Sequence, residues 1–102
     1  MKLNWIRGTG PATTQELADL VEQEGRLGKG SYVTKDGCRC LWGVIEDHTV
    51  YSWPTFRKGR ALSGVSYHSL SQFHCTTADN DGFLGTPEER CVEFVCRLRA
   101  IP

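Results

Sequence analysis

Cysteine and histidine side chains are the residues of this 102-residue chain that could do chemistry most directly. Three thiols and one imidazole offer the donor types of a tetrahedral zinc site. Their spacing differs from the usual Cys-x2–4-Cys knuckle, so cysteines that only pack in the core are the competing interpretation. One of them, Cys38, is expected to be exposed because it follows the Asp36-Gly37 turn signal. The candidate zinc ligands are Cys38, Cys40, His74 and Cys75.

The same residues could instead form a thiol-dependent active site. A helix beginning at Cys40 would lower the pKa of its thiol, and His68 or His74 could act as the base. Asn80 or Asp81 would then orient the imidazole. A chain this short leaves little room for a substrate cleft, so this enzyme is the alternative to a non-enzymatic protein.

A third group of residues could recognise a partner protein. Between residues 42 and 73, aromatic side chains alternate with a short basic run. Aromatic residues and arginine dominate binding hot spots, and Pro54 would stiffen the loop that carries them. A small core that needs bulky side chains is the competing interpretation. The candidate binding residues are Trp53, Phe56, Arg57, Lys58, Arg60, Asn80 and Asp81.

Composition limits the classes of function. With 39% apolar and 24% charged residues, the chain is expected to form one globular domain, residues 1–102. Twelve basic residues balance twelve acidic ones, which argues against the nucleic-acid backbone as the partner. No run approaches the ~20 apolar residues of a membrane helix. Without an export signal, we expect a cytoplasmic protein with free thiols and no cofactor.

The elements that must position these side chains are mostly helices. Thr13 and Glu16 fit a capping box for a helix over 13–25. Thr86, Pro87 and Glu89 start a final helix that runs to Ala100. Its expected buried stripe contains Val92, Val95 and Leu98, with Cys91, Phe94 and Ile101 beside them. A short helix is expected over 66–74, followed by a polar turn at Asp79–Gly82.

The middle of the chain leaves two assignments open. Residues 40–48 fit either a helical face or a buried strand, because periodicity does not separate the two in so short a run. The turn at Lys35–Gly37 predicts a hairpin that pairs 31–34 with 38–42, and residues 50–53 form another candidate strand. The expected fold is therefore a compact, helix-dominated α+β domain with a small antiparallel hairpin.

These pieces resemble an uncharacterised family of small bacterial and phage proteins. The family has a Cys-x-x-Gly-Ala-Ile helix and a Trp-Asn-Asp turn before a Thr-capped final helix. The matching residues are Leu17–Gly30, Cys40–Ile45, Asn80-Asp81 and Thr86–Glu89. Two positions depart from the pattern: Val44 stands where the family has Ala, and Asp79 where it has Trp. The resemblance implies a mainly helical fold with a helix over 40–48, and it implies no activity.

The functional prediction is a small non-enzymatic binding protein whose partner is another protein. Its narrower form, taken from the resemblance, is a phage-encoded inhibitor or adaptor of a host defence protein. The alternatives are the thiol-dependent enzyme built on Cys40 and His74, and a zinc-stabilised interaction module. The sequence does not predict an oligomeric state.

Overall fold

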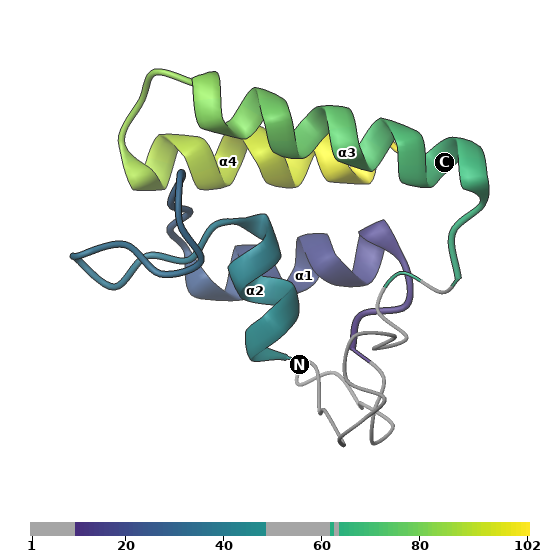
Figure 1. Cartoon of the computed structure of the whole chain (residues 1–102), viewed down its shortest axis with the longest axis horizontal. Coiled ribbons are helices and arrows are strands. Elements are labelled where there is room, and N and C mark those ends of the chain that lie inside the picture. Colours follow the sequence, from purple (N-terminus) through teal and green to yellow (C-terminus); the bar gives the residue numbers. More distant parts are fainter. Residues whose placement is uncertain (1–9, 49–61, 63) are drawn as a thin grey trace.

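The computed structural model describes residues 10–48, 62 and 64–102, and within them the chain folds into four helices. They are α1 (Thr14–Glu24), α2 (Leu41–Asp47), α3 (Tyr67–Gly82) and α4 (Pro87–Arg99). In Figure 1, α3 and α4 lie side by side with opposite directions, joined by a short connection. Helix α1 packs against α4, and α2 packs against α1. The core lies where these helices meet.

Local signals start and stop the two best-defined helices. Each begins with a complete capping box, Thr13 with Glu16 in α1 and Thr86 with Glu89 in α4. Such boxes satisfy amides that have no partner inside the helix. Helix α1 ends at Gly25, whose φ of 75° is the left-handed conformation that glycine adopts without steric cost. Both helices were therefore predicted within one or two residues of their observed ends.

The buried face of α4 differs from the predicted stripe at one position. Cys91, Phe94, Val95 and Leu98 are buried, whereas the side chain of Val92 is 73% exposed. Positions 91, 94, 95 and 98 follow the i, i+3, i+4, i+7 spacing of one helical face. Val92 is rotated out of that face and lies on the solvent side, so its predicted burial was wrong.

The predicted fold class was also wrong, because the described residues contain no strand or sheet. Of the expected hairpin, one isolated antiparallel bridge remains, between Val33 and Arg39. The second strand does not form because Leu41 already begins α2. Residues 40–48 therefore resolve as a helix, and the candidate strand at 50–53 lies outside the described residues.

Helix α3 is longer than the sequence predicts. It begins after Ser66, whose hydroxyl accepts a hydrogen bond from the Ser69 amide, and it continues to Gly82. The polar run Asp79–Gly82 forms its last turn, so the predicted free turn was wrong. Asn80 explains the difference, because its side chain is 1% exposed and binds other parts of the fold. Tertiary hydrogen bonds override the local turn preference of these residues.

Candidate functional site

A cleft of about 260 Å³ separates the loop after Gly28 from the α2–α3 pair. Three segments line it: Gly30–Tyr32, Cys40–Trp42 and the part of α3 between Thr77 and Asp81. Two aromatic side chains reach solvent at this cleft, Tyr32 with 54% and Trp42 with 37% of their surface exposed. Concave sites of this kind, largely apolar with a few polar groups, are typical of ligand binding.

A close approach between backbones fixes one wall of the cleft. Gly43, in the first turns of α2, lies directly against the Tyr32 carbonyl. A Cβ atom added at residue 43 would sit 2.0 Å from that carbonyl oxygen. A side chain at this position is therefore excluded by sterics, and the glycine allows the loop to hold Tyr32 against the helix.

A buried polar network holds the floor of the cleft. The Asn80 amide donates a hydrogen bond to the Gly28 carbonyl at 2.9 Å. Arg90, 3% exposed, donates to the backbone and side-chain oxygens of Asn80 and to the Phe83 carbonyl. Buried polar groups are costly unless they have partners, and here each one has a partner. The network ties the loop to both α3 and α4.

Asp81 closes the edge of the cleft. Its Oδ1 accepts a hydrogen bond from the Gly30 amide at 3.1 Å. Asn80 and Asp81 thus fasten the loop at two points separated by Lys29, the Gly28 carbonyl through a buried hydrogen bond and the Gly30 amide through an exposed one. This double attachment preorganises the cleft without a ligand.

Trp42 is held from the α3 side. Its ring meets the buried Phe73 edge to face, with centroids 5.2 Å apart, and lies 5.8 Å from the His74 ring. The indole is therefore fixed by packing while part of its surface reaches the cleft. A rigid aromatic side chain loses little entropy on binding.

The structure brings only some of the predicted binding residues together. Asn80 and Asp81 line the cleft, although from a helix and not from a turn. The sequence prediction missed Tyr32 and Trp42 as cleft residues. The exposed aromatic at Tyr32, flanked by glycine-rich sequence, is the signal that could have found it. The other predicted binding residues lie outside the described part: Trp53, Phe56, Arg57, Lys58 and Arg60.

The predicted zinc ligands do not form a site. Among the described residues, the donor atoms of Cys38, Cys40, His74 and Cys75 do not converge in any group of three. Cys38 and Cys40 are buried, and His74 and Cys75 face solvent on α3. The expected exposure of Cys38 was wrong, because this residue is buried. Its amide donates a hydrogen bond to the Thr34 hydroxyl, and its carbonyl accepts one from the Thr34 amide, which fixes the backbone with the side chain turned inward.

The thiol-enzyme alternative has one element in place. Cys40 is the residue before α2 and lines the cleft, as a nucleophile would. However, its thiol makes no hydrogen bond to His74 in the described structure. The Asn80 side chain is already hydrogen-bonded to Gly28 and Arg90. A base and its orienting group are thus not assembled around the thiol.

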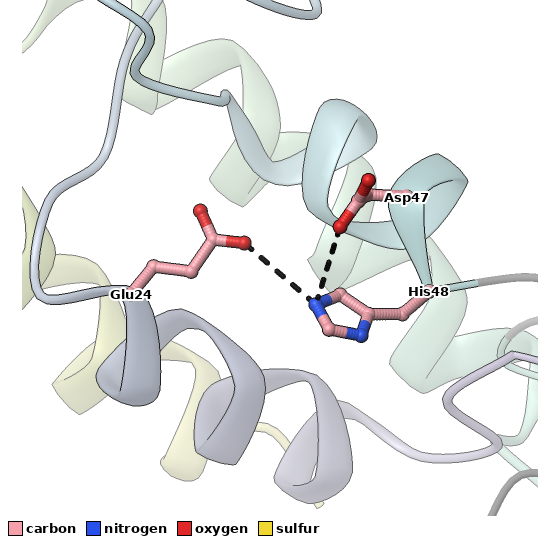
Figure 2. Close-up of side chains that lie close together, drawn as sticks. All are labelled: Glu24, Asp47 and His48. Carbon is pink, nitrogen blue, oxygen red and sulfur yellow. Dashed lines mark ion pairs between the residues drawn. The ribbon is translucent and has the colours of Figure 1, made fainter.

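A second cluster lies at the other end of α2. Figure 2 shows the His48 imidazole between the carboxylates of Glu24 and Asp47, with its Nε2 3.7 Å and 3.6 Å from them. Three such donor atoms could approach a divalent ion. Arg39, however, already lies 3.3 Å from Glu24 and 3.4 Å from Asp47. The guanidinium balances the carboxylates, so the cluster is explained as an ion-pair network.

The thiol of Cys91 lies in the core and belongs to neither of these two clusters. Cys91 donates a hydrogen bond to the Val21 carbonyl at 3.4 Å. Desolvation raises the pKa of the Cys91 thiol above its ordinary value, and the charges of Glu22 and Glu24 raise it further. This cysteine packs between α1 and α4 as a neutral thiol, as the packing interpretation predicted.

Comparison with known proteins adds no function. No protein-family model, curated protein or solved structure matches the chain. In the described residues, no helix is both long and apolar enough to cross a membrane. The functional argument therefore depends on the geometry of the cleft.

Proposed function

We propose that the chain is a non-enzymatic binding module that takes a segment of a partner protein into the cleft between the Gly30–Tyr32 loop, α2 and α3. The observation that carries the proposal is the double attachment of the loop to α3 through Asn80 and Asp81. A cleft that is already shaped loses less conformational entropy on binding.

The chemistry of the cleft favours binding over catalysis. Its walls offer the aromatic surfaces of Tyr32 and Trp42, which are the side-chain types enriched at protein interfaces. The polar groups of Asn80 already bind within the fold, so they build the site and do not act on a substrate. The resemblance to small phage proteins is the ground for the narrower form of the proposal, inhibition of a host defence protein.

The test is a peptide selection on the intact chain. A displayed library of random peptides is screened against the immobilised protein, and bound peptides are mapped by NMR on the isotope-labelled chain. We expect peptides that shift the Gly30 amide and the Trp42 indole. Absence of selected peptides, or shifts confined to residues away from the cleft, would contradict the proposal.

Two tyrosine variants provide a matched comparison. Tyr32 lines the cleft, whereas Tyr67 is 89% exposed at the start of α3 and does not line it. Neither side chain is buried, so both alanine variants should fold. We expect Tyr32→Ala to weaken the selected peptides about tenfold or more, as for an aromatic hot spot. Equal weakening by Tyr67→Ala would overturn the assignment of the site.

A further inference from the structure

The charged residues at the cleft indicate which chemical class of ligand it binds. Among the described residues that line it, Asp81 is the one with a side chain charged at neutral pH. Lys29 precedes Gly30 in the chain but does not line the cleft. The site therefore combines aromatic and aliphatic walls with a single negative charge at its edge.

The polar groups of the cleft differ in what they leave available. Asn80 binds Gly28 and Arg90, and the Thr77 hydroxyl donates to the His74 carbonyl. The Asp81 Oδ1 accepts from the Gly30 amide, while its Oδ2 accepts no hydrogen bond from the described part of the chain. An ionised carboxylate can accept several hydrogen bonds, so the Asp81 carboxylate keeps most of its capacity.

From this pattern, and resting on the function proposed above, we infer that the cleft recognises a basic side chain, lysine or arginine, of the partner protein. The aliphatic stem would pack along the exposed rings of Tyr32 and Trp42 while the cationic end reaches Asp81. A cation near an indole or phenol face also gains cation–π attraction. The volume of about 260 Å³ is large enough to admit one long side chain.

Capped single residues test this inference directly. The probes are the methylamides of Nα-acetyl-lysine, Nα-acetyl-arginine and Nα-acetyl-norleucine, the last of which keeps the aliphatic stem and lacks the charge. Each is titrated into the labelled chain, and the Gly30 amide and Trp42 indole signals are followed by NMR. We expect the two cationic probes to bind at least fivefold more tightly than norleucine.

Removal of the Asp81 charge tests which group recognises the cation, and removal of the Asp79 charge is the control. Asp81→Asn keeps an oxygen that can accept from Gly30, so the loop attachment is preserved while the charge is lost. We expect this variant to bind all three probes equally. Asp79→Asn removes a charge from an exposed residue on the same helix outside the cleft, and should leave the preference for cationic probes unchanged.

Two results of the probe titrations would overturn the inference. One is norleucine binding as tightly as lysine and arginine; the other is a cationic preference that survives in Asp81→Asn. The proposed function is tested separately, by the peptide selection, and fails if no selected peptide binds the cleft. If the peptide selection gives cleft-binding peptides that contain no basic residue, the binding module stands and the basic ligand is wrong.

Discussion

The polar residues near the two ends of α2 differ in burial and in their partners. At its start, beside the cleft, Asn80 and Arg90 are buried and bonded to backbone, and one carboxylate, that of Asp81, keeps acceptor capacity. At its end, the partly exposed carboxylates of Glu24 and Asp47 each contact both Arg39 and His48. The first region presents a rigid surface whose one carboxylate can still accept hydrogen bonds. In the second region the charged groups already pair with one another.

The difference shows why a cluster of titratable residues is a poor guide to a site. The group around Arg39 has the more conspicuous chemistry, yet its charges already have partners. The cleft has fewer ionisable groups, but its geometry is fixed by buried hydrogen bonds, which are worth more than exposed ion pairs. Variants in the two regions should therefore differ in cost.

The largest expected effect comes from Asn80→Ala. This change leaves the Gly28 carbonyl without its donor and the buried Arg90 guanidinium without a side-chain acceptor. We expect the free energy of unfolding to fall by about 3 kcal/mol, because unpaired buried groups carry their full desolvation cost. Urea unfolding measures it. Asp79→Ala, at an exposed neighbour that pairs only with the exposed Arg97, should cost under about 0.5 kcal/mol, and equal costs would show that the buried hydrogen bonds of Asn80 do not stabilise the fold.

Gly43→Ala is expected to have the next largest effect. In an unhindered helix alanine is favoured over glycine by up to about 1 kcal/mol. Here the new Cβ would overlap the Tyr32 carbonyl, so we expect a loss of about 2 kcal/mol in the free energy of unfolding, as in an overpacked core, together with loss of peptide binding. Gly82→Ala, which meets nothing within 4 Å, is the control and should be neutral or stabilising. A neutral Gly43→Ala would show that the loop does not pack as described.

Arg39→Ala tests the other end of α2. It removes the counter-charge of Glu24 and Asp47, but all three side chains are partly exposed, so we expect a loss of about 1 kcal/mol in the free energy of unfolding. Added salt should reduce this loss by screening. Lys35→Ala removes an exposed lysine that has no ion pair in the described structure and serves as the control. A loss of 3 kcal/mol that salt does not change would place this cluster alongside the cleft network.

The smallest expected effect concerns Cys91, which belongs to neither region. Its thiol pKa is higher in the folded than in the unfolded state, because burial disfavours the thiolate. The stabilisation is thus complete at neutral pH and is lost as the pH rises above about 8.5, where the unfolded thiol ionises. Unfolding titrations at pH 7 and pH 9.5 on the wild type and Cys91→Ala measure it. A wild-type loss no larger than that of the variant would contradict this linkage.

The sequence predicted those elements whose signals are local. Capping boxes at Thr13 and Thr86 gave α1 and α4, since the hydrogen bonds that start these helices lie within four residues. The length of α3 was not predictable in this way. Asn80 and Asp81 favour turns locally, and they stay helical because Gly28 and Gly30, about fifty residues earlier, bind their side chains.

The candidate site was predictable only in part for the same reason. Asn80 and Asp81 were selected as residues of a loop, yet their role depends on a tertiary contact with no local signature. Trp42 was noted among the aromatic residues, but its position beside Tyr32 follows from the Gly43 contact with the Tyr32 carbonyl. Spacing along the chain contains no information about such a backbone contact.

The attachment of the loop through Asn80 and Arg90 has a thermodynamic consequence. Because one side-chain network joins the cleft floor to α3 and α4, the cleft should not open without weakening the helix pair. A ligand in the cleft would then be linked to global unfolding, and saturation at one hundred times its dissociation constant would add about 2.7 kcal/mol to stability. The melting temperature of the whole domain becomes a reporter of occupancy, suited to screening partners.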